Sequence, residues 1–125
     1  MRQKRPLQIG DVITVQLPSH SPHGREQTGL RPAIVLGLPH LLGKPRYPLV
    51  VVAPVTTQTG PWANQSPMLY LPLQAGDGGL TRDCVVLLDQ LRSVDANRID
   101  RRIGTLNPQQ LAPIMAGLKR IFQFS

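Results

Sequence analysis

Hydrophobic and polar residues alternate through "GDVITVQL" at residues 10–17, and this period of two predicts a half-buried β-strand. The positions from Ile13 to Leu17 in steps of two are expected to face a core, with Thr14 and Gln16 on the opposite face. Turn-forming residues follow in "PSHSPHG", which predicts a loop after this strand.

Further strands are predicted where β-branched and aliphatic runs are bounded by Gly, Pro and Asp. These segments are residues 31–37, 47–57, 68–73 and 82–91, with a short strand near "RIGTL". Pro54 has no amide proton to donate to a neighbouring strand, so it is expected at an edge, a bulge or the end of its strand.

The hydrophobic period changes in the last segment, residues 107–122, where a helix is predicted. Its apolar residues recur at helical spacing: Leu111, Ile114, Met115, Leu118 and Phe122. Asn107 is the expected N-cap, Pro108 suits the first helical position, and Gln110 completes a capping-box pattern. Pro113 cannot donate to the carbonyl four residues back, so a kink or a later start of the helix is expected.

Short strands followed by one helix, with no crossover helices between the early strands, exclude a parallel doubly wound sheet. We therefore expect a mainly β, α+β fold: a small SH3-like barrel or twisted antiparallel sheet with a C-terminal helix. The chain has 125 residues, 41% of them hydrophobic, which predicts a single domain over residues 1–125. Thirteen prolines and eleven glycines indicate a loop-rich body rather than a helical bundle.

The chain is strongly basic, because 14 Lys and Arg residues face 7 Asp and Glu residues, which gives a formal charge of +7. Such an excess favours an anionic partner, with nucleic acid first, but it is also compatible with a merely soluble basic surface. Charge alone does not separate the two interpretations.

The sequence contains one cysteine, Cys84, so an intramolecular disulfide and a thiolate metal cluster are excluded and a reducing cytoplasm fits. The apolar setting "DCVVLL" predicts that Cys84 is a small core residue. The basic N-terminus is interrupted by Pro6, Gln8 and Asp11, so a secretory signal is not expected. The run "YPLVVVAPV" is too short to span a bilayer, and no membrane association is expected.

Familiar catalytic patterns are missing from the sequence: it has no HExxH, Walker loop, GxSxG or Cys/His metal spacing, so no metal or cofactor is expected. His20 and His23 share a loop with no carboxylate placed to orient either ring, and a solvated role for His23 is favoured over a catalytic one. What remains is a set of polar residues at strand ends, where a sheet can present functional groups. They are Glu26, Gln27, Arg31, Thr56, Thr57, Gln58, Arg82, Asp83, Asp89 and Gln90.

Each of these residues also has a structural explanation. Arg31 can pair with Glu26 or Asp83 at the surface, an interaction that stabilises little. Thr56 can satisfy backbone groups at the end of its strand. Individually, then, these residues leave structural and functional roles open.

Three segments taken together resemble a known family. "GDVITVQLPS…GREQTGLRPAIVL", "VVVAPVTTQ" and "LTRDCVVLLDQLRSVDANRI…IGTL" are similar, in order and spacing, to the MazF/PemK-type toxins of bacterial toxin–antitoxin pairs. The resemblance extends over roughly residues 9–122, including the terminal helix.

The resemblance implies a homodimer with an SH3-like barrel or twisted sheet. It implies a cytoplasmic, metal-independent endoribonuclease that cuts single-stranded RNA at short motifs, arrests translation and is inhibited by an antitoxin with an acidic tail. The catalytic arginine and threonine of the family match Arg31 and Thr56. The other candidates for RNA contacts are Arg25, Gln27, Thr57, Gln58, Arg82, Asp89 and Gln90.

Metal-free cleavage of RNA uses the 2′-hydroxyl as an internal nucleophile and leaves a 2′,3′-cyclic phosphate and a 5′-hydroxyl. The guanidinium of Arg31 can bind phosphate oxygens as a planar fork, and Pro32 biases Arg31 toward an extended backbone. Thr56 can donate to the same phosphate, and Glu26 is the carboxylate candidate for the general base.

Two positions depart from the family pattern. Some members have a histidine where this chain has Arg25, and some have an arginine acid where it has Leu87. Trp62 is expected either to stack on an unpaired base or to cover core or subunit interface. Two alternatives remain for the function: a toxin of the same fold that poisons DNA gyrase without catalysis, and an inactive nucleic-acid-binding SH3-like module.

Overall fold

The structure is a computed structural model that describes residues 5–19, 22 and 24–124. The described chain forms seven strands, two α-helices and four short 3-10 turns. The strands are β1 (Asp11–Leu17), β2 (Gly29–Gly37), β3 (Leu49–Thr56), β4 (Tyr70–Leu73), β5 (Cys84–Leu87), β6 (Arg92–Asp95) and β7 (Ile99–Thr105). The helices are α1 (Pro61–Gln65) and α2 (Pro108–Ile121), and the 3-10 turns are η1 (Pro39–Leu42), η2 (Asp77–Gly79), η3 (Leu88–Gln90) and η4 (Ala96–Arg98).

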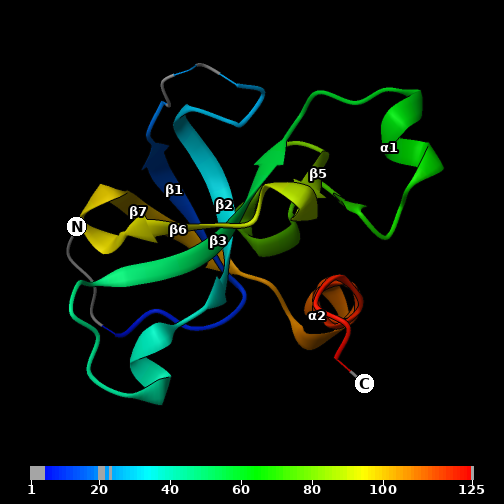
Figure 1. Cartoon of the computed structure of the whole chain (residues 1–125). Coiled ribbons are helices and arrows are strands. Elements are labelled where there is room, and N and C mark those ends of the chain that lie inside the picture. Colours follow the sequence, from blue (N-terminus) through cyan, green and yellow to red (C-terminus); the bar gives the residue numbers. More distant parts are fainter. Residues whose placement is uncertain (1–4, 20–21, 23, 125) are drawn as a thin grey trace.

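All strand pairs are antiparallel, in the order β4-β5-β3-β2-β1-β7, and β6 pairs with β3 outside this series. β3 is paired with β6 along residues 49–52 and with β5 at residues 55–56, so it changes partner along one edge. The sheet twists strongly, and α2 lies beside it (Figure 1). The expected mainly β architecture with a C-terminal helix is confirmed, but the sheet is not closed into a barrel.

The sheet buries apolar side chains on both faces. One cluster lies between the sheet and α2 and includes Val12, Ile34, Val55, Val86 and Ile114. The other lies where β6 and β7 fold over the central strands and includes Ile13, Val15, Ala33, Val52 and Val94. The alternation predicted for β1 is confirmed, because Ile13, Val15 and Leu17 enter one cluster while Gln16 is exposed.

The predicted strand over residues 82–91 is wrong in extent, because β5 occupies only four of these residues. The 3-10 turn η3 then redirects the chain into β6, which pairs with the other half of β3. The segment that follows, β7, is a full seven-residue strand against β1 rather than a short one. Pairing partners of this kind are set by the tertiary fold and not by local hydrophobic period.

Pro54 lies inside β3 and is fully buried, not at the end of the strand. It pairs with Ala33 on the β2 side and sits where the other edge of β3 changes from β6 to β5. A missing amide proton is tolerated at such an interruption, because no ladder hydrogen bond is required there.

The helix α2 begins at Pro108, so of the two expected consequences of Pro113, a kink or a later start, the later start is not observed. The Asn107 side chain accepts a hydrogen bond from the backbone N–H of Gln110 at 2.9 Å, and the Gln110 side chain accepts one from the backbone N–H of Asn107 at 2.8 Å. This capping box holds the first turn, and Ile114 is fully buried against the sheet. Cap and burial together keep the helix continuous through its internal proline.

Asp11, the aspartate of "GDVITVQL", is a buried structural anchor. It accepts hydrogen bonds from Arg5 (2.8 and 3.1 Å), from the Gln8 amide (2.8 Å) and from the Thr105 hydroxyl (2.7 Å). Burial opposes its charge, but the hydrogen bonds from Arg5, Gln8 and Thr105 outweigh burial and lower the pKa of this carboxyl below its ordinary value. Asp11 therefore ties the N-terminal segment to β1 and β7.

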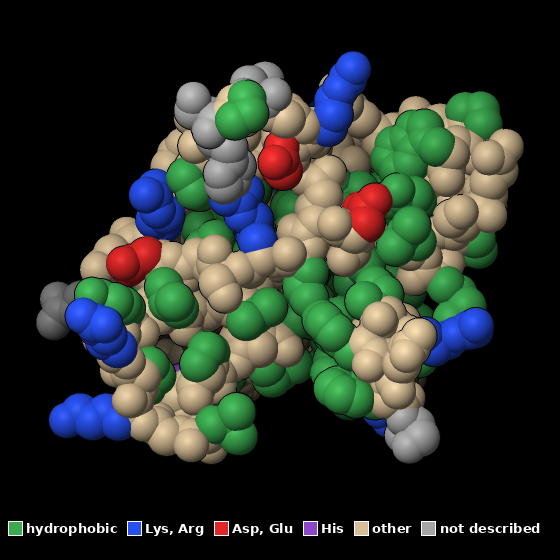
Figure 2. All heavy atoms as spheres, in the orientation of Figure 1, with side chains coloured by type: hydrophobic (Ala, Val, Ile, Leu, Met, Phe, Trp, Pro, Cys, Tyr) green, Lys and Arg blue, Asp and Glu red, His purple; other side chains and the backbone are tan. Residues whose placement is uncertain are grey.

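No helix within the described ranges is long and apolar enough to cross a membrane. The face shown in Figure 2 carries hydrophobic side chains over much of its area, with basic side chains mainly at its edges. Two groups of large apolar side chains are exposed. One lies in residues 41–49 (Leu41, Leu42, Tyr47 and Leu49), and the other at the end of α2 and just beyond it (Ile121, Phe122 and Phe124).

Candidate functional site

The start of β2 and the end of β3 lie side by side, because the two strands are antiparallel neighbours. Their register pairs Ala33 with Pro54 and Ile34 with Ala53. Arg31 precedes this paired stretch by two residues and Thr56 follows it by two residues, so both lie at the same end of the strand pair. The pairing of Thr56 with Val85 of β5 fixes the threonine from its other side.

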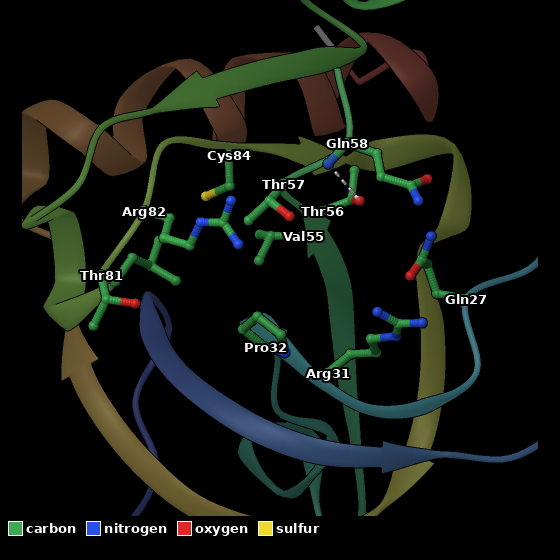
Figure 3. A pocket seen from close by; sticks show the side chains of 11 residues that line it. Gln27, Arg31, Pro32, Val55, Thr56, Thr57, Gln58, Thr81, Arg82 and Cys84 are labelled. Carbon is green, nitrogen blue, oxygen red and sulfur yellow. Dashed lines mark hydrogen bonds between the residues drawn. The ribbon is translucent and has the colours of Figure 1, made fainter. Parts of the chain in front are cut away.

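Arg31 and Thr56 line one pocket of about 220 Å³ (Figure 3). Its apolar walls come from Pro32, Val55, Leu80 and Cys84. The polar side chains around it are those of Gln27, Arg31, Thr56, Thr57, Gln58, Thr81 and Arg82. No Asp or Glu of the described chain lines this pocket, so its charge comes from two guanidinium groups.

The Arg31 side chain is exposed and held by its own loop. Its Nε donates to the carbonyl oxygen of Thr28 at 2.9 Å, which fixes the plane of the guanidinium. Arg31 forms no ion pair with any described residue. The alternative role of Arg31 in a surface ion pair with Glu26 or Asp83 is therefore not observed, and neither Nη atom has a hydrogen-bond or ion-pair partner among the described residues.

Thr56 is oriented by a hydrogen bond that leaves its proton available. Its Oγ1 accepts a hydrogen bond from the backbone N–H of Gln58 at 3.1 Å (Figure 3). A hydroxyl that accepts in this way can still donate to a ligand oxygen. The bond is of the kind expected at a strand end, so the structural and functional roles of Thr56 are compatible.

Opposite Arg31, the guanidinium of Arg82 points toward Thr57 across the pocket (Figure 3). Arg82 precedes β5, and Arg82 and Thr57 are both exposed. The two arginines thus stand on different walls, so one anion can meet Arg31 and Thr56 while a neighbouring one meets Arg82. Thr81 lines the same pocket and was not among the residues predicted from the sequence, although it directly precedes Arg82 in "LTRD".

Glu26, Asp89 and Gln90 lie around a neighbouring hollow of about 330 Å³. The Glu26 side chain turns back against Gly24. A Cβ atom placed on Gly24 would lie about 2.9 Å from the carboxyl carbon of Glu26. The structure therefore does not bring Glu26 together with Arg31 and Thr56. Its assignment as general base stays a prediction from the sequence.

Asp89 and Gln90 are engaged with the protein itself. Asp89 accepts from the Tyr70 hydroxyl at 2.6 Å, which raises the pKa of that phenol, and Tyr70 packs edge-on against Trp62 with ring centroids 4.9 Å apart. Gln90 Oε1 accepts a hydrogen bond from the backbone N–H of Gln27 at 2.7 Å. Both side chains thus brace loops beside the pocket, and Trp62 lies outside it, 41% exposed.

The remaining sequence candidates lie elsewhere. Arg25 is exposed and outside the pocket, and Leu87 is 3% exposed in a small cluster with Ala63 and Val85. Leu87 therefore offers no group to the site. His20 and His23 lie outside the described residues.

Cys84 is confirmed as a core residue and also forms part of the pocket wall. Burial raises the pKa of its thiol to about 11, with smaller contributions from nearby aspartates. The thiol therefore stays protonated near neutral pH and is no proton acceptor for a ligand. Within the described residues, no cluster of three or more His, Cys, Asp or Glu side chains could hold a metal ion.

The family resemblance implies a catalytic arginine and threonine in a twisted sheet with a C-terminal helix, and Arg31 and Thr56 line one pocket of such a fold. A family model described as PemK-like, MazF-like toxin of type II toxin-antitoxin system matches residues 8–122. The chain belongs to this toxin family. The matched region of the PemK/MazF-like toxins includes every residue of the pocket.

Individual PemK/MazF-like relatives agree with this assignment. The endoribonuclease MazF of Staphylococcus saprophyticus is 28% identical over 110 residues, 86% of this chain and 84% of that protein. The endoribonuclease EndoA of Bacillus subtilis is 30% identical over 98 residues, 77% of this chain and 78% of that protein. The solved MazE–MazF structure (Form-II) from Deinococcus radiodurans is similar with a TM-score of 0.66 and 25% identity, over 94% of this chain and 96% of that one.

Proposed function

We propose that this toxin is a sequence-selective, metal-independent endoribonuclease that cuts single-stranded RNA by attack of the 2′-hydroxyl and thereby inhibits translation. One observation carries the proposal: Arg31 and Thr56, from facing strand ends, present unpaired donors to the same open pocket. The activity named for the relatives from S. saprophyticus and B. subtilis supports it.

The pocket suits a phosphodiester undergoing internal attack. The Nη groups of Arg31 bind the non-bridging oxygens, and the hydroxyl of Thr56 donates to the oxygen on which charge grows as phosphorus becomes pentacovalent. The apolar walls at Pro32 and Val55 strengthen these interactions, since they lower the local dielectric. The nucleophile belongs to the substrate, so no metal-activated water is needed. The 2′-hydroxyl loses its proton to solvent water at the open side of the pocket, the bond from phosphorus to the 5′-oxygen breaks, and that oxygen takes up a proton from water to leave as the 5′-hydroxyl.

Selection of RNA is assigned to the polar residues around the scissile group. Arg82 and Thr57 hold a neighbouring phosphate, and the side chains of Gln27 and Gln58 present amide groups that can pair with base edges. Arg25 adds an exposed positive charge near the entry of β2. Unpaired bases fit this arrangement better than a duplex, because their edges are accessible.

We also propose that the toxin acts in the cytoplasm as a homodimer and is inhibited by a cognate antitoxin with an acidic tail. The exposed apolar groups at residues 41–49 and at the end of α2 support self-association. The formal charge of +7 supports an acidic partner. The similar D. radiodurans structure is a MazE–MazF complex.

The proposal is tested by incubating the purified protein with a long single-stranded RNA in excess EDTA. We expect discrete fragments with 5′-hydroxyl ends, which polynucleotide kinase labels directly. Loss of cutting in Arg31→Ala and Thr56→Val, with retention in the exposed control Arg101→Ala, ties the activity to the pocket. Cutting only after Mg²⁺ is added would contradict the metal-free mechanism, and binding without cutting would favour an inactive RNA-binding module.

A further inference from the structure

Three hydrogen bonds connect η3 and the first residue of β6 to the guanidinium of Arg31. The side chain of Gln90 accepts from the backbone amide of Gln27 at 2.7 Å, and Arg92 Nη1 donates to the carbonyl of Gln27 at 3.3 Å. The next carbonyl, that of Thr28, accepts from Arg31 Nε at 2.9 Å. Gln90 and Arg92 thus bind both sides of one residue in the loop that holds Arg31.

The Gln27–Gly29 segment depends on these contacts because the sheet does not hold all of it. Gln27 and Thr28 precede β2, so they have no ladder partners, and Gly29 takes a positive φ of +83° as the chain enters the strand. Both bonds to Gln27 are partly buried. Partly shielded hydrogen bonds of this kind order a loop more than exposed ones do.

The direction of the Thr28 carbonyl decides where the Arg31 guanidinium lies. Arg31 itself sits in β2 opposite Val15, so its backbone is fixed by the sheet, while its long side chain has several rotatable bonds. The bond from Nε to Thr28 removes much of that freedom and leaves both Nη groups for the phosphate. A shift of this carbonyl would therefore move the catalytic donors.

We propose that Gln90 is a positioning residue for RNA cleavage: through the Gln27 amide it fixes the Thr28 carbonyl and hence the guanidinium of Arg31. The inference rests on the proposed ribonuclease function and changes the role predicted for Gln90 from RNA contact to support. Its amide oxygen is used inside the protein, and Gln90 does not line the pocket that contains Arg31.

The two roles differ in what they do to the kinetics. A base-reading residue contributes to substrate binding and choice, so its loss raises KM and changes the cut sites. A residue that positions a transition-state donor affects mainly kcat, because misplacing a catalytic group by about 1 Å can cost on the order of 10²-fold in rate.

The experiment compares Gln90→Leu, which removes the acceptor at similar size, with Gln90→Glu, which keeps an acceptor for the Gln27 amide. Gln109→Leu, at an exposed position of α2, is the matched control. For each variant we measure kcat and KM on a fluorogenic RNA, map the cut sites on a long RNA and record the melting temperature. In ¹⁵N-labelled protein, the resonance of Arg31 Nε–H, assigned by its loss in Arg31→Lys, reports the bond to Thr28 directly.

We expect Gln90→Leu to lower kcat by about 10- to 100-fold with unchanged cut sites and little change in KM. We expect Gln90→Glu and the control to stay within about threefold of the parent kcat. Solvent exchange of the Arg31 Nε proton rises in Gln90→Leu and stays at the parent rate in Gln90→Glu.

Unchanged kcat in Gln90→Leu, altered cut sites, or a Glu variant as slow as the Leu variant would each overturn the proposal. Should Gln90→Leu fail to fold, the Glu variant decides from kcat and from the Nε–H signal. If the parent protein cuts no RNA, the ribonuclease proposal fails, while the exchange rate of Arg31 Nε–H in the Gln90 variants still tests the positioning of the guanidinium.

Discussion

Replacement of Arg31 by lysine separates the charge of this side chain from its geometry. The guanidinium has five N–H donors, of which Nε–H is bonded to Thr28, so four on the two Nη atoms remain for a phosphate. Lysine keeps the positive charge, but it has no planar fork and no donor that can bind Thr28 and the substrate together in this way. The substitution therefore removes the fixed orientation and at least one phosphate contact.

The expected size follows from that difference. Loss of one preorganised donor to a developing oxyanion costs about 2.7–4 kcal/mol, or about 10²–10³ in kcat. Since the charge survives in Arg31→Lys, we expect a fall near the lower limit, about 10²-fold, with KM changed by less than about threefold. Arg31→Ala loses the charge as well and is expected to be at least about 10³-fold slower.

The assay is steady-state cleavage of a fluorogenic single-stranded RNA in EDTA, with melting temperatures to confirm folding. Arg101→Lys, an exposed arginine of β7 outside the pocket, is the control and should match the parent protein. Near-parent kcat in Arg31→Lys would refute the reasoning, because a point charge would then suffice. Equal losses in the Lys and Ala variants would show that charge contributes nothing beyond geometry.

Three further predictions test other parts of the structure. Thr56→Val should lower kcat by about 10- to 100-fold while Thr56→Ser stays within about fivefold of the parent, since serine keeps the hydroxyl; kinetics on the same RNA check this. Arg82→Ala should raise KM more than it lowers kcat and reduce the salt dependence of RNA binding by about one phosphate contact, as measured by titrations at several salt concentrations. Asp11→Asn should lower the free energy of unfolding at neutral pH by about 1–3 kcal/mol, measured with urea. Because folding lowers the pKa of Asp11, its stabilisation is complete above about pH 5 and is lost as pH falls through the folded value, so the gap between parent and variant should narrow in acid and not in alkali.

Elements defined by local pattern could be predicted from the sequence. The alternation in β1 and the helical period with a capping box in α2 are local signals, and both correspond to observed elements. The division of residues 82–95 into β5, a 3-10 turn and β6 could not be predicted, because it arises from two different strands pairing along one edge of β3. Leu88 continues the apolar run of β5 into the turn, and Leu91 follows the turn directly, so the hydrophobic period alone does not mark the break.

The candidate site shows the same division between local and long-range information. Arg31 and Thr56 were matched through the family resemblance, and the strand register brings them to one pocket. A carboxylate is a natural base, which favours Glu26 from the sequence, but the direction of its side chain depends on a loop with no periodic signal, and the carboxyl lies against Gly24. The support by Gln90 was missed for a related reason, since its partner is a backbone amide 63 residues away that no side-chain motif reveals.

Under the proposed mechanism, the pocket stabilises charge without a carboxylate beside the scissile group, since no Asp or Glu of the described residues lines it. Arg31 lies near the start of β2, Arg82 lies just before β5, and Pro32 and Val55 line the same pocket. A bound phosphate would therefore be shielded from water on the side of Pro32 and Val55. There the interaction of a guanidinium with a second developing negative charge is stronger than in bulk water. A carboxylate on the same wall would repel the phosphate of the substrate, and it would neutralise the positive charge of Arg31 before the RNA binds. Because the Glu26 carboxyl lies against Gly24 and does not line the pocket, we expect Glu26→Gln to leave kcat within about threefold of the parent protein. A loss of about tenfold or more on the same RNA would instead support Glu26 as the general base.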